Sequence, residues 1–148
     1  ADTVPSGGTS DFVPEMIHSA AKGLDYACFV REDSRIPFMT MPDAIQATLQ
    51  LAQADKSKLT RTVYNLGAFN PSAEEVATLV QEHFTGAQTT FEPDSERQAI
   101  VDSWPADVDD QAARDDWGFA PKHDLQSAFR DYLVPRIKAR YASEGAPD

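Results

Sequence analysis

The sequence has 148 residues, of which 41% are hydrophobic and 25% are charged, and its formal net charge at pH 7 is −11. A chain of this length can form one domain with a hydrophobic core, so we expect residues 1–148 to act as one unit. The acidic balance argues against partners such as nucleic acid and anionic membranes. No apolar run is long enough to span a bilayer. The single cysteine, Cys28, excludes an internal disulfide and fits a reducing compartment such as the cytoplasm.

The chain opens with the turn-forming sequence ADTVPSGGTS, which precedes a predicted helix. The glycines at 7–8 are compatible with a frayed terminus or with a loop whose backbone approaches a ligand closely. Thr9 or Ser10 is a suitable N-cap for a helix over residues 11–22, and Gly23 would end it. The predicted apolar face of this helix comprises Phe12, Val13, Met16, Ile17 and Ala20.

Two extended segments and a second helix are predicted next. Residues 26–30 are apolar and predict a short buried strand. Residues 36–41 predict another extended run, in which Pro37 favours a strand start or an edge. Pro42 suits the first turn of a helix, which we expect to continue to residue 54. Its predicted apolar stripe comprises Ala44, Ile45, Thr48, Leu49 and Ala52.

The middle of the chain continues this alternation. Residues 62–66 are β-branched and aromatic, which predicts a strand. Ser72 and Glu75 have the spacing of a capping box, and the helix that they start should end at Phe84. Residues 89–92 predict another short strand. Short strands separated by helices indicate a mixed α/β or α+β fold.

Both tryptophans lie in the acidic stretch 94–121. A short helix capped by Asp94 or Ser95 would place Ala99, Ile100 and Trp104 on one face. Trp104 is then either part of the core or the wall of a small-molecule pocket, because an indole offers a large rigid surface and one hydrogen-bond donor. A second helix should end at Gly118, and a last helix over 124–141 should kink at Pro135.

The sequence does not predict a complete catalytic centre. The three histidines lack metal-ligand spacing, and no glycine fingerprint of a Rossmann unit follows a predicted strand. No tyrosine has a lysine four residues later. Cys28 lies in an apolar run, which favours a core position over a nucleophilic one.

A series of motifs carries a family resemblance: GGTSDF, RIPFMTMPDAIQATL, TVYNLGAFNPSAEEV, RQAIVDSWP and ARDDWGFAPKHDL. Together they resemble the C-terminal part of NAD-dependent L-threonine 3-dehydrogenases, which belong to the extended short-chain dehydrogenase/reductases (the NAD-dependent epimerase/dehydratase family). The resemblance covers residues 6–134. RQAIVDSWP and ARDDWGFAPKHDL are its most specific parts, whereas the frame of MPDAI, YNLG and WGFAP is shared with sugar-nucleotide epimerases.

The resemblance implies that residues 1–148 form a substrate-binding C-terminal domain. In the family, an N-terminal Rossmann half carries the NAD site and a catalytic Tyr-x-x-x-Lys, and these motifs are absent from this sequence. We therefore expect a fragment of an enzyme that oxidises L-threonine to 2-amino-3-ketobutyrate. The chain alone should bind no NAD and show no turnover, and its partner would be the missing Rossmann half.

The resemblance also implies a substrate site. The family's Gly-Gly-Thr-Thr-Asp loop borders the substrate and matches Gly7, Gly8, Thr9, Ser10 and Asp11 here, with Ser10 in place of the second threonine. Trp104 would wall the same pocket. Such a site would suit L-threonine or a similar small amino acid, because its carboxylate needs hydroxyl and N–H donors and an apolar lid excludes water.

Two alternatives are compatible with the same residues. The chain could be the corresponding part of a sugar-nucleotide epimerase or dehydratase, or a binding or assembly module without catalysis.

In the family fold, the helices that begin near Asp11 and Pro42 pack against the cofactor half. We therefore expect exposed apolar faces on both helices and self-association of the chain alone.

Overall fold

The computed structural model describes residues 3–144 and confirms the predicted mixed fold. Its elements are, in chain order, α1 (Phe12–Ala21), β1 (Tyr26–Cys28), α2 (Met41–Gln53), the 3₁₀ turn η1 (Lys56–Lys58), α3 (Ala73–His83), β2 (Thr89–Phe91), α4 (Ser95–Asp102), α5 (Gln111–Trp117), α6 (Leu125–Ser127), the π-helical η2 (Ala128–Leu133) and α7 (Val134–Glu144). β1 and β2 form a two-stranded parallel sheet in which Tyr26 pairs with Thr89 and Cys28 with Phe91.

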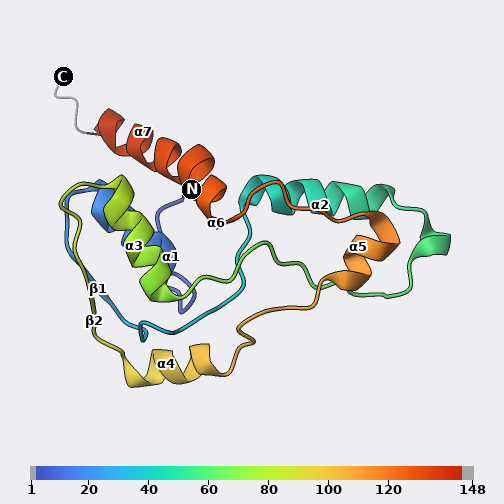
Figure 1. Ribbon diagram of the computed structural model, residues 1–148, viewed down its shortest axis with the longest axis horizontal. Helices are drawn as coiled ribbons and strands as arrows, with labels where there is room; N and C mark the ends of the chain where they lie inside the picture. Colours follow the sequence, from blue (N-terminus) through green and yellow to red (C-terminus); the bar gives the residue numbers. More distant parts are fainter. Residues whose placement is uncertain (1–2, 145–148) are drawn as a thin grey trace.

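The main core lies where α1 and α3 pack between the sheet and α7 (Figure 1). Phe12, at the start of α1, makes edge-on contacts with the rings of Phe29 and Phe38. Cys28 is fully buried in this core, and burial raises the pKa of its thiol. The largest fully buried side chains are Phe12, Phe129, Met16, Ile17, Ile137, Val30, Val76, Val80 and Cys28.

A smaller apolar cluster joins α2 to α5 at the opposite end of the molecule (Figure 1). Its buried members are Ala47, Ala113 and Phe119, and Trp117 packs against them from the last turn of α5. The indole of Trp117 also meets the ring of Tyr64 edge-on, with the ring centroids 5.9 Å apart. Trp117 is therefore a packing residue.

The starts of α3 and α4 and the end of α5 follow the predicted capping chemistry. Ser72 Oγ accepts from Glu75 N at 3.1 Å and Glu75 Oε2 accepts from Ser72 N at 2.7 Å, which confirms the capping box of α3. Asp94 Oδ1 accepts from the N–H groups of residues 96 and 97 and caps α4. Gly118 ends α5 with φ of +75°, a conformation that favours glycine.

Three local predictions were wrong. Residues 62–66 form no strand, because no segment within residues 3–144 pairs with their backbone, and the hydroxyl of Tyr64 donates to Asp116 at the end of α5. Residues 36–41 form only an isolated antiparallel bridge, between Phe38 and Phe69. The residue preceding α1 is Asp11 rather than Thr9 or Ser10, and it makes no side-chain cap.

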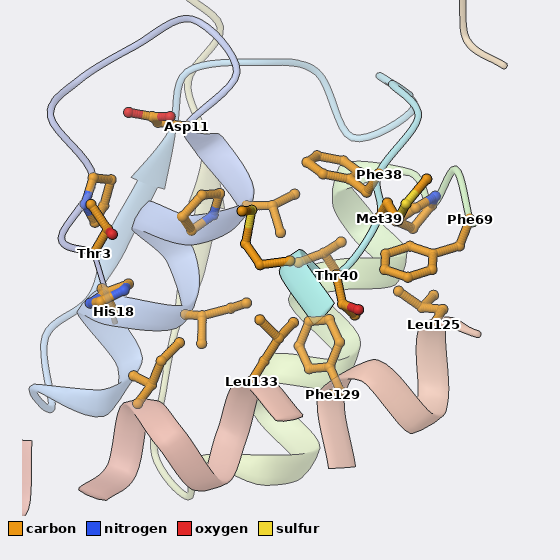
Figure 2. A pocket seen from close by; sticks show the side chains of 18 of the residues that line it. Thr3, Asp11, His18, Phe38, Met39, Thr40, Phe69, Leu125, Phe129 and Leu133 are labelled. Carbon is orange, nitrogen blue, oxygen red and sulfur yellow. The ribbon is translucent and has the colours of Figure 1, made fainter. Parts of the chain in front are cut away.

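The predicted C-terminal helix is a helical run over residues 125–144 with an irregular middle. The π-helical turn η2 directly precedes Pro135, which lies in the first turn of α7. Proline has no N–H to donate to the carbonyl of residue 131, so the preceding turn cannot close as a regular α-helix. Phe129 and Leu133 extend from this run towards α1 (Figure 2).

The predicted apolar stripe of α2 faces outward. The exposed fractions of Met41, Ile45 and Leu49 are 57%, 56% and 52%, respectively, while Asp43 and Ala47 are the buried residues of the helix. The apolar face of α1, in contrast, is buried because α3 and α7 cover it. The expectation of an exposed apolar face is thus confirmed for α2 and wrong for α1.

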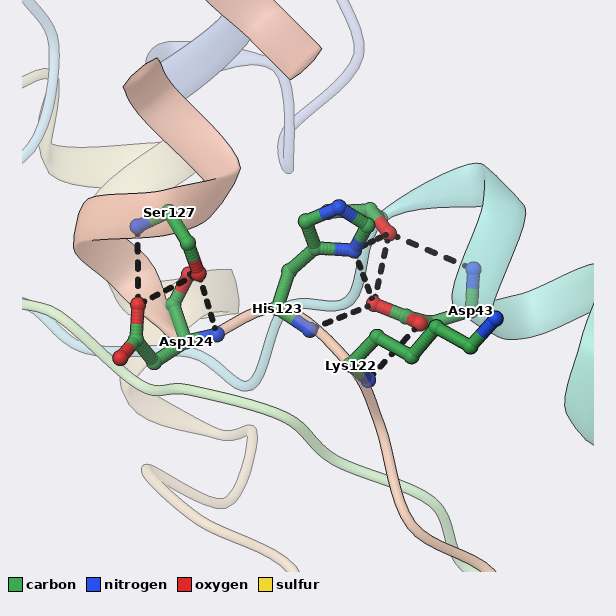
Figure 3. Close-up of polar contacts among 6 residues, drawn as sticks. Asp43, Lys122, His123, Asp124 and Ser127 are labelled. Atoms are coloured by element: carbon green, nitrogen blue, oxygen red, sulfur yellow. Dashed lines mark hydrogen bonds and ion pairs between the residues drawn. The ribbon is translucent and has the colours of Figure 1, made fainter. Parts of the chain in front are cut away.

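Asp43 fixes the start of α2 to the segment that leads into α6 (Figure 3). Its carboxylate accepts from Lys122 N at 3.0 Å, His123 N at 3.2 Å and the Thr40 hydroxyl at 2.8 Å. His123 Nδ1 lies 2.8 Å from Asp43 Oδ2. Burial disfavours the charged form of Asp43, but these hydrogen bonds outweigh that effect and lower the pKa of its carboxyl group.

No helix within residues 3–144 is both long enough and apolar enough to cross a lipid bilayer.

Ser72→Ala tests the capping box of α3. The substitution removes the acceptor for Glu75 N, so the free energy of unfolding should fall by about 0.5–2 kcal/mol. Urea unfolding followed by circular dichroism measures the change. Ser95→Ala is the matched control, because Ser95 is exposed at the start of α4 and its hydroxyl bonds to none of the described residues. Equal stability of the wild type and Ser72→Ala would contradict the role of the box.

Asp43→Asn tests the buried carboxylate and has a predicted pH dependence. At neutral pH the variant should lose about 1–3 kcal/mol of unfolding free energy, because an amide has only one acceptor oxygen, so His123 N and the Thr40 hydroxyl would face an NH₂ group in place of Oδ2. Since the pKa of Asp43 is lowered on folding, its contribution is present above the unfolded value of about 3.9 and is lost as pH falls through the folded value. The difference in unfolding free energy between the wild type and the variant should therefore disappear at acid pH. The exposed Asp25→Asn is the control, and a gap that persists in acid would disprove the assignment.

Candidate functional site

A mainly apolar pocket of about 390 Å³ lies between the N-terminal segment, α1, residues 38–41 and the C-terminal helices (Figure 2). Phe38, Met39 and Phe69 line one side of it, and Leu125, Phe129 and Leu133 line another. The polar residues along its wall are Thr3, Ser6, Asp11, His18 and Thr40. A preformed apolar pocket with a few polar groups is typical of small-molecule sites.

Asp11 organises the glycine-containing loop at the edge of this pocket. Its Oδ2 atom accepts from Ser6 N at 3.2 Å and from Gly8 N at 2.9 Å, while Asp11 N donates to Gly8 O at 3.0 Å. A Cβ at Gly8 would lie 3.2 Å from Asp11 Oδ2, so a larger residue would press on the carboxylate. The Oδ1 atom of Asp11 receives no hydrogen bond from any residue within 3–144.

The two hydroxyl residues of the loop also have free bonding capacity. Thr9 is half-buried and Ser10 is exposed, and neither hydroxyl bonds to another described residue. Neither side chain lines the apolar pocket. Of the polar groups of this loop, only Asp11 lines the pocket, and the hydroxyl groups of Thr9 and Ser10 lie outside its lining.

Trp104 lies apart from these groups. It follows the last turn of α4, where its N–H donates to Val101 O at 3.0 Å, and its side chain is 38% exposed. Trp104 is not among the residues that line the pocket beside Asp11. Gly8, Thr9, Ser10 and Asp11 thus lie in one loop, and Trp104 does not share the apolar pocket with Asp11.

The helix α4 nevertheless links Trp104 to the loop. Arg97, in its first turn, donates from Nη2 to Gly8 O at 2.8 Å, and its guanidinium lies 3.0 Å from the ring centroid of Phe29. Arg97 was not among the residues predicted for the site. The sequence feature that could have pointed to Arg97 is its position as the first residue of RQAIVDSWP, one of the two stretches with the most specific family resemblance.

Metal ligation finds no support in the part of the chain that the structure describes. Residues 3–144 contain no group of three His, Cys, Asp or Glu side chains that could hold an ion. His18 bonds to Tyr141 at 2.8 Å, His83 stacks on Phe129, and His123 pairs with Asp43. The histidines have separate packing roles.

Comparison with known proteins identifies relatives over most of this chain. No protein-family model matches it. It is 40% identical over 125 residues to the mitochondrial L-threonine 3-dehydrogenase of Bos taurus, a match that covers 84% of this chain and 33% of the relative. It is also 40% identical over 122 residues to an uncharacterized epimerase/dehydratase of Staphylococcus haemolyticus, with 82% of this chain and 38% of the relative covered.

Solved structures agree with these relatives. A GalE-like L-threonine dehydrogenase from Cupriavidus necator in its apo form superposes with a TM-score of 0.82 and 38% identity, covering 93% of this chain and 48% of that one. The chain thus spans between a third and a half of the length of the proteins that it matches. It belongs to the family of L-threonine 3-dehydrogenases and epimerase/dehydratase proteins, and it corresponds to their C-terminal part.

Proposed function

We propose that this chain is the substrate-binding part of an oxidoreductase that oxidises the β-hydroxyl of L-threonine with NAD, giving 2-amino-3-ketobutyrate. The observation that carries the proposal is the loop of residues 8–11, whose free carboxylate oxygen and free hydroxyls occur in a chain 40% identical to an L-threonine 3-dehydrogenase. Recognition of a small zwitterion requires both kinds of group close together.

The charges of the loop suggest an orientation for the amino acid. Asp11 Oδ1 would accept a hydrogen bond from the ammonium group, because an ionised pair is stronger than a neutral one. The hydroxyls of Thr9 and Ser10 would donate to the carboxylate. Trp104 would cover the substrate once the rest of the enzyme is in place, since an indole at the pocket mouth would exclude water.

The chemical step needs groups that this chain does not contain. No glycine-rich turn joins a strand to a helix within residues 3–144, so the described residues do not fit NAD. We assign the cofactor and the general base to a nucleotide-binding part such as the full-length relatives have. The role of this chain is to bind L-threonine, to orient its β-hydroxyl and to exclude water.

The outward face of α2 supports a nucleotide-binding partner. Met41, Ile45 and Leu49 are more than half exposed and lie on one side of the helix at spacings of four residues. A contiguous exposed apolar face marks an interaction surface. We propose that the nucleotide-binding part covers this face, and that the isolated chain covers it by self-association.

A sugar nucleotide is the second candidate substrate. The match to a staphylococcal epimerase/dehydratase is as high in identity as the match to the bovine dehydrogenase. The pocket of about 390 Å³ is also larger than a small amino acid requires. The substrates must therefore be compared directly.

A fusion of the chain to the nucleotide-binding part of the Cupriavidus necator enzyme provides that comparison. The fusion should form NADH with L-threonine and should not convert UDP-sugars. Asp11→Asn should lower kcat/KM for L-threonine by about 10- to 100-fold, because a hydrogen bond to a charged group contributes about 1.5–3 kcal/mol. Thr78→Ala, an exposed change on α3, is the control. Turnover of UDP-sugars without turnover of L-threonine would overturn the assignment.

Analytical ultracentrifugation of the isolated chain tests the exposed face of α2. The wild type should self-associate at high concentration, and the double variant Ile45→Glu/Leu49→Glu should be monomeric, because two charges would oppose burial of the face. Val63→Glu is the matched control, since Val63 is 77% exposed but lies outside α2. A wild-type chain that stays monomeric would rule out this surface as a contact between copies.

A further inference from the structure

Arg97 is the only described residue of α4 whose side chain reaches the glycine loop. Its Nη2 atom donates to Gly8 O at 2.8 Å and lies 3.4 Å from Gly7 O, 89 and 90 residues away in sequence. Its guanidinium carbon lies 3.0 Å from the centroid of the Phe29 ring. A planar cation on an aromatic face has a fixed orientation, which a flexible ammonium group would lack.

These two bonds fix the direction of the neighbouring N–H groups. In a trans peptide the C=O and N–H groups point in opposite directions, and no described peptide bond is cis. With Gly7 O directed at Arg97, the N–H of Gly8 points away from α4 and donates to Asp11. With Gly8 O directed the same way, the N–H of Thr9 also points away from α4.

No described residue accepts a hydrogen bond from Thr9 N–H. The Thr9 N–H and the hydroxyls of Thr9 and Ser10 are neighbouring groups in the part of the loop that follows Gly8, and none of the three bonds to a described residue. Donors that are fixed before a ligand arrives bind an anionic group more strongly than mobile donors, because no ordering cost remains.

Arg97 itself is held rigidly by the anchoring of α4. Gln98 is buried and its Oε1 accepts from Arg31 N at 2.7 Å, while its Nε2 donates to Asp102 at 2.7 Å. Both Nη atoms of Arg31 bond to the carboxylate of Asp102 at 2.9 Å. Asp94 caps the first turn. The guanidinium thus extends from a fixed helix.

We propose that Arg97 is a positioning residue that aims Thr9 N–H and the adjacent hydroxyls at the carboxylate of the substrate. The identity of that substrate as a small amino acid rests on the proposed function. The geometric part, that Arg97 orders the loop through Gly7 O and Gly8 O, stands independently of it.

The test uses the full chain, isotope-labelled for NMR, in wild-type form and as Arg97→Lys, Arg97→Met and Arg114→Met. Amide–water exchange of Gly8 and Asp11 measures loop order, and titration with L-threonine measures affinity. Arg114→Met is the matched control, because Arg114 also lies over a phenylalanine ring, that of Phe119, but far from the loop. Exchange at Val76 and Val80, both fully buried in α3, reports whether each variant is folded.

Arg97→Met should speed exchange at Gly8 and Asp11 by about tenfold and weaken L-threonine binding by about three- to tenfold, the range expected for one lost hydrogen bond. Arg97→Lys should have the melting temperature of the wild type, and its loop exchange rates and L-threonine affinity should lie between those of the wild type and Arg97→Met. The reason is that an ammonium group can donate to one carbonyl but does not stack on a ring as a guanidinium does. Arg114→Met should match the wild type. If Arg97→Met does not fold, Arg97→Lys carries the test.

Unchanged loop exchange in both Arg97 variants would overturn the proposal. Faster exchange with unchanged L-threonine affinity would also overturn it, because loop order would then have no effect on binding. If the wild type shows no response to L-threonine while Arg97→Met still loosens the loop, the ordering of the loop by Arg97 is supported, and binding of L-threonine by this chain alone is contradicted.

Discussion

The buried amide of Gln98 is the constraint on which the arrangement of the candidate site depends. The sheet has only two strands of three residues each, so strand pairing alone cannot orient α4. Gln98 bonds to Arg31 N, to the Ser34 hydroxyl and to Asp102, and so it fixes α4 to the segment after β1. A satisfied buried polar network of this kind specifies one geometry. Arg97 and Trp104 lie at the two ends of the helix that it holds.

The proposed function treats the candidate site as one side of a binding site. Asp11 lies at the edge of an apolar pocket, Trp104 is exposed, and Met41, Ile45 and Leu49 on α2 are exposed within residues 3–144. We propose that a nucleotide-binding part, such as the full-length relatives have, covers Trp104 and the apolar face of α2. The relatives, which are two to three times as long as their matched parts, agree with that proposal.

Most helices could be predicted because their capping residues act on backbone groups nearby in sequence. Strand pairing and the contacts of the candidate site could not, because they join distant parts of the chain. Ser72 with Glu75, and Asp94, act on N–H groups within three residues, so their helices could be located from sequence. Residues 62–66 have strand-like composition, but a strand needs a partner that composition does not show. The role of Arg97 could not be predicted from sequence, because its contacts with Phe29 and Gly8 join parts of the chain that are far apart in sequence. The substrate-binding role of residues 8–11 stays a prediction, and Trp104, which was predicted to wall the same pocket, does not line the apolar pocket beside Asp11.

A crystal structure of the fusion to a nucleotide-binding part, solved with bound L-threonine, would show whether residues 8–11 hold the substrate. The ammonium group should lie within hydrogen-bond distance of Asp11, the carboxylate should accept hydrogen bonds from Thr9 N–H and the adjacent hydroxyls, and Trp104 should cover the amino acid. L-threonine bound without contact to residues 8–11, or with Trp104 still in solvent, would contradict the proposed function.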